Sequence, residues 1–302
     1  MWSRRGFLGA IAATLPMRAL AKETPTVTTD LLTRPIPSTG EKLPVIGLGS
    51  WQTFDTDDLA PIKPVVAKFL ALGGRVIDSS PMYGKSEQAI GRMLADLQKQ
   101  DPRTPRPFLA TKVWTRGKAE GVAQMKRSLA RLGVTKLDLM QIHNLVDWQT
   151  HLATLRAWKA AGTIRYLGIT HYAHGELDAM EKIIEKEKVD FVQLPYSVAE
   201  RGAEKRLLPA AAAAGVAVLV MEPFAKGALF ARVKGKPLPA VAKDLGCTSW
   251  AQLFLKFIVG HPAVTCPIPA TSKLAHVEDN LGALRGPLPT DAQRKAILAA
   301  IG

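Results

Sequence analysis

Cysteine is scarce in this chain of 302 residues, which contains only Cys247 and Cys266. The two stand far apart and form no CxxC pair, so the sequence lacks both a cysteine zinc motif and a disulfide framework. Cys266 lies in the apolar run AVTCPIP, which favours a buried thiol, although a bridge between the two cysteines stays open. We predict no metal site.

A phosphate-binding glycine loop is also missing. No GxGxxG motif follows the first expected strand, where the glycines of GLGSW have a different spacing. A Rossmann-type dinucleotide-binding sheet would carry that motif in its first loop, so its absence argues against such a sheet. Internal repeats and low-complexity linkers are lacking as well, which favours a single domain in the mature chain.

Acidic side chains are in the minority, with 26 Asp and Glu against 40 Lys and Arg and a formal net charge of +14. Such a balance is typical of proteins that bind nucleic acid or acidic membranes. The basic residues are dispersed among the acidic ones, however. Lys126, Arg127 and Arg131 could share a helix face, but no aromatic platform accompanies them. We therefore expect a solvated basic surface and no nucleic-acid partner.

The first 21 residues have the pattern of an export signal. Residues 3–8 read SRRGFL, a twin-arginine pattern, and an Ala-rich apolar stretch leads to the small-x-small site ALA at 19–21. That stretch is short and contains Pro16, so no stable membrane insertion is expected. An unstructured extension or an amphipathic anchor is the alternative. We expect the twin-arginine export machinery to deliver residues 22–302 to the periplasm.

Short apolar runs alternate with amphipathic helical stretches along residues 22–302. The expected strands cover residues 45–50, 74–78, 108–113, 137–143, 164–170, 190–195, 216–221 and 263–269. Several are apolar on both faces, as a parallel sheet buried under helices requires. Eight alternations predict a closed (β/α)8 TIM barrel more than an open doubly wound sheet. Proline and glycine between two apolar runs before the first strand predict a β-hairpin cap. Glycines are expected to end helices in the left-handed conformation at Gly73, Gly133, Gly162, Gly215 and Gly260.

Four polar side chains are expected at the carboxyl ends of the second, third and fourth strands, where barrel enzymes place their chemistry. They are Asp78, Tyr83, Lys112 and His143. The ammonium of Lys112 would lower the pKa of a neighbouring phenol, and a carboxylate would keep that ammonium charged. Tyr83 could then donate a proton to a carbonyl oxygen that His143 orients.

Each of these four residues also has an ordinary structural interpretation. Asp78 could cap a helix, Tyr83 could be a half-buried aromatic, Lys112 a surface lysine and His143 a core histidine. Taken singly, the structural interpretation is favoured for all except Lys112. Their joint occurrence at neighbouring strand ends favours the chemical one.

The chain resembles the aldo-keto reductase family in segments that follow one another over nearly all of residues 22–302. The resembling segments are GLGSWQTF (47–54), RVIDSSPMYGKSEQAIG (75–91), ATKVW (110–114), MQIHN (140–144), VQLPYS (192–197), EPFAKGAL (222–229) and IPATSKLAHVEDN (268–280). Asp78 and Tyr83 have the family's five-residue separation. The resemblance implies an NAD(P)H-dependent reductase of aldehydes and ketones that acts as a monomer.

The resemblance also implies roles for individual residues. Tyr83 would be the general acid, Lys112 its pKa-lowering partner, Asp78 the counter-ion of the lysine and His143 the substrate-orienting group. The substrate mouth would be lined by Trp51 and Trp114. The cofactor would be bound by Thr170, His171, Gln193, Met221, Phe224, Lys226, Gly227, Thr271, Ser272, Lys273 and Asn280.

Three departures from the family pattern concern the cofactor. Residues 170–171 are Thr-His where many members have Ser-Asn, and Met221 stands where an aromatic often stacks on the nicotinamide. Ala270 and His276 replace the Lys and Arg that recognise the 2′-phosphate in many members, and Lys273 could substitute for them. We expect NADP(H) rather than NAD(H).

Two other functions are compatible with the same barrel. One is a nicotinamide-nucleotide sensor or regulatory subunit, against which the complete set of Asp78, Tyr83, Lys112 and His143 argues. The other is a redox-free isomerase or lyase, which would leave the cofactor-like segments unexplained.

Overall fold

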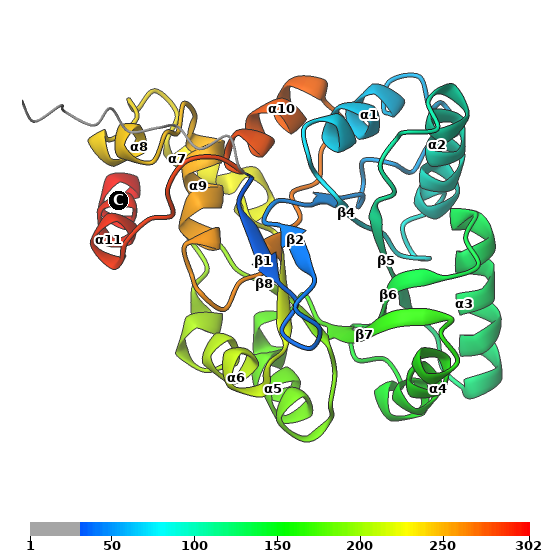
Figure 1. The fold of residues 1–302 in the computed structure, drawn as a ribbon. Helices are drawn as coiled ribbons and strands as arrows, with labels where there is room; N and C mark the ends of the chain where they lie inside the picture. The colour runs from blue at the N-terminus through cyan, green and yellow to red at the C-terminus, as the bar shows by residue number, and fades with distance from the viewer. Residues whose placement is uncertain (1–30) are drawn as a thin grey trace, which may run out of the picture.

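Eight short parallel strands form the centre of the molecule, hydrogen-bonded in the order β3 to β10 (Figure 1). The computed structural model describes residues 31–302, and the expected signal segment at 1–21 lies outside them. The strands are β3 (Leu48–Gly49), β4 (Val76–Asp78), β5 (Phe108–Val113), β6 (Leu137–His143), β7 (Ile164–Thr170), β8 (Phe191–Pro195), β9 (Ala217–Met221) and β10 (Cys266–Pro267). A parallel bridge between Gly49 and Ala270 joins the two edges of the sheet. The strands therefore close into the predicted (β/α)8 barrel.

The closing seam is made by strands shorter than expected. The predicted runs at 45–50 and 263–269 contribute only two paired residues each. A Cβ atom added at Gly49 would lie 2.7 Å from the Ile268 carbonyl oxygen, so glycine permits the close approach. Pro267 and Pro269 lack a backbone N–H and limit the ladder on the other side.

Helices surround the strands in one outer layer (Figure 1). They are α1 (Lys63–Ala71), α2 (Ser86–Gln100), α3 (Lys118–Leu132), α4 (Trp148–Ala160), α5 (Leu177–Lys186), α6 (Leu207–Ala214), α7 (Ala228–Arg232), α8 (Ala240–Asp244), α9 (Trp250–Val259), α10 (Leu274–Gly282) and α11 (Asp291–Ile301). Helices α7 and α8 lie between β9 and α9 in the sequence, and α11 packs against α8 and α9. Among residues 31–302, no helix combines the length and apolarity that a membrane span needs.

The predicted hairpin is present and closes one end of the barrel. Strands β1 (Thr33–Pro35) and β2 (Lys42–Pro44) pair antiparallel. Ile36 and Leu43 of this hairpin join a buried cluster with inward residues of the barrel such as Phe108 and Phe191. The amino-terminal end of the barrel is thus filled with apolar side chains. A ligand-sized space is left for the carboxyl end.

Four of the five helix-ending glycines have the expected positive φ, and the fifth does not. Gly133 and Gly215, for example, have φ of 70° and 66°. Gly260 has φ of −66°, so that prediction was wrong. A Cβ atom there would lie 2.5 Å from the Pro289 ring, and close packing rather than backbone conformation explains the glycine. Cys247 and Cys266 are both buried and unpaired, so the possible bridge is not formed.

Candidate active site

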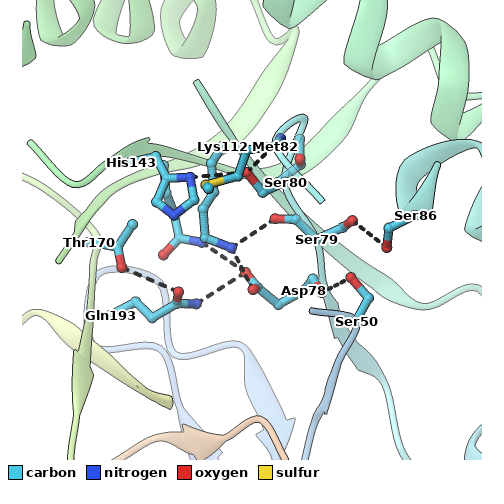
Figure 2. A network of polar contacts seen from close by, with 12 residues as sticks. Ser50, Asp78, Ser79, Ser80, Met82, Ser86, Lys112, His143, Thr170 and Gln193 are labelled. Carbon is cyan, nitrogen blue, oxygen red and sulfur yellow. Dashed lines mark hydrogen bonds and ion pairs between the residues drawn. The ribbon is translucent and has the colours of Figure 1, made fainter. Parts of the chain in front are cut away.

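A buried ion pair lies at the carboxyl end of the barrel. The Nζ atom of Lys112 is 2.6 Å from Oδ2 of Asp78 and donates a second hydrogen bond of 2.8 Å to the Ser79 carbonyl. The side-chain amides of Gln141 and Gln193 donate to Oδ1 of the same carboxylate at 3.0 and 3.1 Å. Figure 2 shows the contact of Gln193 with Asp78. The register of the barrel strands brings Asp78, Lys112 and Gln141 together. Asp78 ends β4, and Lys112 of β5 lies opposite Gln141 of β6.

The carboxylate keeps the buried lysine charged. Burial alone lowers the pKa of Lys112, but the charge of Asp78 and the Tyr83 phenol raise it, and the net pKa lies above its ordinary value. The ammonium lies 5.0 Å from the centroid of the Tyr83 ring. Burial raises the pKa of Tyr83, and the charge of Lys112 opposes that rise without cancelling it. Tyr83 therefore holds its proton at neutral pH and can donate it.

His143 ends β6 beside Tyr83. The two rings meet edge to face with centroids 5.9 Å apart, and Nδ1 of His143 lies 3.0 Å from Oγ of Ser80 (Figure 2). Burial and the positive charge of Lys112 lower the pKa of His143 to about 2. The imidazole is therefore neutral, and a neutral imidazole can act as a hydrogen-bond donor without competing for the proton of Tyr83.

These groups open into a cavity of about 1040 Å³ at the carboxyl end of the strands. Most of the predicted site residues line it. They are Trp51, Asp78, Tyr83, Trp114, His143, Gln193, Met221, Phe224, Lys226, Gly227, Thr271 and Asn280. Lys112 and Thr170 lie behind the wall, where Thr170 donates to the Gln193 side chain at 3.3 Å.

Besides Thr170, three predicted cofactor residues lie off the cavity wall, namely His171, Ser272 and Lys273. Nδ1 of His171 accepts the backbone N–H of Ala173 at 3.0 Å, and its ring stacks on Tyr172. The loop after β7 thereby turns His171 aside, and Tyr172 reaches the cavity instead. Lys273 precedes α10 with an exposed side chain, and its N–H donates to the Thr271 hydroxyl.

The loop after β9 forms one wall of the cavity in an unusual backbone conformation. Glu222, Ala225, Lys226 and Gly227 all have positive φ, three of them without being glycine. Left-handed conformations cost free energy for such residues and cluster where a loop is shaped for a ligand. The Lys226 ammonium lies 3.2 Å from the Glu222 carboxylate, so this wall carries a neutralised pair.

Sequence reasoning missed several cavity residues. The main ones are Met82, Asn144, Tyr172, Glu222, Phe230 and Asp279. Asp279 and Asn144 adjoin predicted residues and could have been found by taking neighbours in the loop. Ser80 contacts His143 and Gln141 contacts Asp78, although neither lines the cavity. Alternate residues of a strand point to the same side, and Gln141 stands two residues before His143 in β6. Within residues 31–302, no group of three or more His, Cys, Asp or Glu side chains could hold a metal ion.

Comparison with known proteins gives concordant matches. A sequence model of the Aldo/keto reductase family matches residues 45–297. Aldo-keto reductase YhdN of Bacillus subtilis is 28% identical over 214 residues, which cover 64% of this chain and 62% of that protein. The chain spans between 48% and 62% of the length of the first curated relatives it matches.

Solved structures match over most of both chains. The holo form of aldo-keto reductase AKR11C1 from Bacillus halodurans superposes with a TM-score of 0.74 at 21% identity, covering 90% of this chain and 96% of that one. An aldo/keto reductase from Klebsiella pneumoniae in complex with NADP and acetate superposes with a TM-score of 0.70 at 25% identity, covering 85% and 91%.

Proposed function

The chain belongs to the aldo/keto reductase family, and from this premise we propose that it reduces aldehydes or ketones with a nicotinamide cofactor, Tyr83 donating the proton. The observation that carries the proposal is the buried Asp78–Lys112 pair beneath Tyr83, at the floor of an open cavity. A pure binding module has no need for a buried charge pair next to a protonated phenol.

Each residue has a defined part in the proton transfer. The Tyr83 hydroxyl donates its proton to the substrate oxygen, and the Lys112 ammonium stabilises the phenolate that remains. Asp78 holds the ammonium in place and keeps it charged. The His143 imidazole donates a hydrogen bond to the same oxygen and orients the carbonyl. A bound reduced nicotinamide supplies the hydride that the carbonyl carbon accepts.

The cavity has the donors and acceptors that a nicotinamide dinucleotide needs. At its inner end are the Gln193 amide and Asn144, whose Oδ1 is buried without a hydrogen-bond partner among the described residues. An amide donor would satisfy such an oxygen. The loop 224–227 would lie along the pyrophosphate, and Thr271 and Asn280 line the same cavity. The residues present therefore fit the cofactor.

NADP(H) is proposed over NAD(H). The Klebsiella pneumoniae relative was solved with NADP, and this chain places Lys273 next to Thr271 and close in sequence to His276 at the far end of the cavity. The exposed ammonium of Lys273 is free to turn toward a 2′-phosphate, for which a lysine acts as a point charge.

The mouth of the cavity supports an apolar or aromatic carbonyl substrate. Trp51, Met82, Trp114, Tyr172 and Phe230 all line the cavity, and all are unusually exposed for large apolar side chains. Exposed apolar side chains gathered at one cavity mark a binding surface. Among the described residues that line the cavity, Lys226 is the one lysine or arginine, and it is paired with Glu222.

Binding and turnover of the purified protein test the proposal. NADPH and NADH would be titrated by nicotinamide fluorescence, and aromatic aldehydes and glyoxals would then be added to follow cofactor oxidation. We expect tighter NADPH binding and oxidation that depends on the aldehyde. Tight binding without turnover on any carbonyl would favour the sensor function. Absence of binding to either nucleotide would overturn the assignment.

We also propose that the protein is exported folded to the periplasm, on the evidence of SRRGFL at 3–8 and ALA at 19–21. The double substitution Arg4→Lys with Arg5→Lys should leave the protein in the cytoplasm, while Arg18→Lys, outside the pair, should not. Cell fractionation and amino-terminal sequencing measure both outcomes, and a mature chain should begin at Lys22. Equal periplasmic amounts of the two variants would contradict export by this route.

A further inference from the structure

The Ser80 hydroxyl has two hydrogen-bond partners among the described residues, and one of them is the His143 ring. The residue is fully buried in the loop between β4 and α2. Its Oγ lies 3.0 Å from Nδ1 of His143 and accepts the backbone N–H of Met82 at 3.3 Å (Figure 2). Among the described residues, Oγ of Ser80 has no other hydrogen-bond partner. The neighbouring Ser79 points away, toward Ser86 at 3.1 Å.

The direction of the Ser80–His143 hydrogen bond follows from counting protons. A serine hydroxyl carries one proton and two lone pairs, and the Met82 amide can only donate to it. Within residues 31–302, the hydroxyl proton therefore has no acceptor other than Nδ1 of His143. If Nδ1 carried a proton instead, the buried hydroxyl proton of Ser80 would be left without a partner, which is costly. Nδ1 is thus the acceptor.

The tautomer of His143 follows from its charge. Burial and the nearby Lys112 keep the ring neutral, so it carries a single proton. With Nδ1 accepting from Ser80, that proton is on Nε2. His143 lines the cavity, and its ring lies between those of Tyr83 and Trp114, with centroids 5.9 and 6.4 Å away.

We propose that Ser80 is a positioning residue, whose hydroxyl holds His143 as the Nε2–H tautomer and directs that N–H into the cavity as a donor to the substrate carbonyl. The proposal rests on the proposed reductase function for its kinetic part only. Without the Ser80 hydroxyl, both tautomers of His143 become accessible. The tautomer with an unprotonated Nε2 presents a lone pair to the carbonyl oxygen and opposes the reaction.

Three variants separate positioning from simple packing. Ser80→Ala removes the hydroxyl, Ser80→Thr retains it, and Ser86→Ala removes a buried hydroxyl that does not contact the site. For Ser80→Ala we expect kcat to fall about tenfold, the effect of losing one hydrogen bond, with nucleotide affinity unchanged. Ser80→Thr should restore most of the rate, and Ser86→Ala should retain it.

The decisive measurement is the tautomer itself. Long-range ¹H–¹⁵N correlation spectra of protein labelled in histidine, with His143 assigned by the missing signals of His143→Gln, report which nitrogen is protonated. The wild type and Ser80→Thr should show Nε2–H, and Ser80→Ala should show a mixture. An Nδ1–H signal in the wild type, or an unchanged tautomer in Ser80→Ala, would overturn the proposal. Because this measurement needs no turnover, failure of the reductase assay would be recognised separately.

Discussion

Two lysines among residues 31–302 are fully buried, and their pKa values are shifted in opposite directions. Lys112 lies at the carboxyl end of the barrel and Lys256 in α9 of the outer layer. Nζ of Lys256 donates to the carbonyls of Gly286 and Pro287, both at 3.0 Å, and the described residues give it no ion pair. Burial lowers its pKa to about 8. Lys112 is fully buried as well, yet its pKa is raised.

The main difference between the two sites is a carboxylate. Burial disfavours the ammonium in both places, and at Lys112 the Asp78 carboxylate, 2.6 Å away, reverses the effect together with the Tyr83 phenol. The side chain of Lys256 donates hydrogen bonds to two carbonyls of the loop that leads to α11. Holding this loop requires hydrogen-bond donors and does not require a positive charge. The Lys112 site fixes a positive charge under Tyr83. The buried lysine that is paired with a carboxylate is thus the one whose positive charge the proposed chemistry needs.

The largest expected effect is the difference in stability between two variants, in each of which one of these lysines is replaced with methionine. Lys112→Met leaves the Asp78 carboxylate buried without its cation, which should cost about 3–5 kcal/mol of unfolding free energy. Lys256→Met removes a charge that burial already disfavours, so it should change stability at neutral pH by less than about 1.5 kcal/mol. Urea unfolding of both variants measures the difference. Equal losses would show that the carboxylate does not distinguish the sites.

A smaller effect is expected in the pH dependence of stability. The pKa of Lys256 is about 8 in the folded protein and 10.5 as its ordinary value. Between these values the unfolded chain binds more protons, so stability rises with pH. The wild type should gain about 2–3 kcal/mol relative to Lys256→Met from about pH 8 to about pH 10.5. If the difference between the two proteins stays constant over this range, Lys256 is not buried as a disfavoured ammonium.

The smallest expected effect is on the pH dependence of activity, when the Lys112 site loses its carboxylate and so resembles the Lys256 site. Asp78→Asn removes the charge that holds up the pKa of Lys112, so the lysine should lose its proton at a lower pH, as Lys256 does. Carbonyl reduction by this variant should then fall about tenfold between about pH 7 and about pH 9. Asp138→Asn is the matched control, since Asp138 is a buried carboxylate in β6 that pairs with Arg165. The same profile in both variants would contradict the account.

The sequence predicted the strands that are buried on both faces. The bounds of β5, β6 and β7 agree with the predicted runs at 108–113, 137–143 and 164–170, because apolar runs bounded by polar turns leave little choice of register. It also predicted which groups meet at the floor of the site. In a parallel barrel the carboxyl ends of all strands lie on one face, so residues at neighbouring strand ends meet independently of the loop conformations.

Loop-dependent features could not be predicted in the same way. The structure places His171, a predicted cofactor residue, off the cavity wall, where its Nδ1 accepts the Ala173 N–H. The Ser80 hydroxyl reaches His143 only through the conformation of the loop after β4. The burial of Lys256 depends on the loop before α11 folding back over α9. Such side-chain directions are set by contacts between segments distant in sequence.

The substitution Tyr83→Phe tests the central claim most directly, because it removes only the hydroxyl that is proposed to donate the proton. NADPH affinity, measured by nicotinamide fluorescence, should stay unchanged, while the rate of aldehyde reduction should fall by at least about 100-fold. Turnover that remains within about tenfold of the wild-type rate would contradict the account, since the Asp78–Lys112 pair would then serve no proton donor at this position.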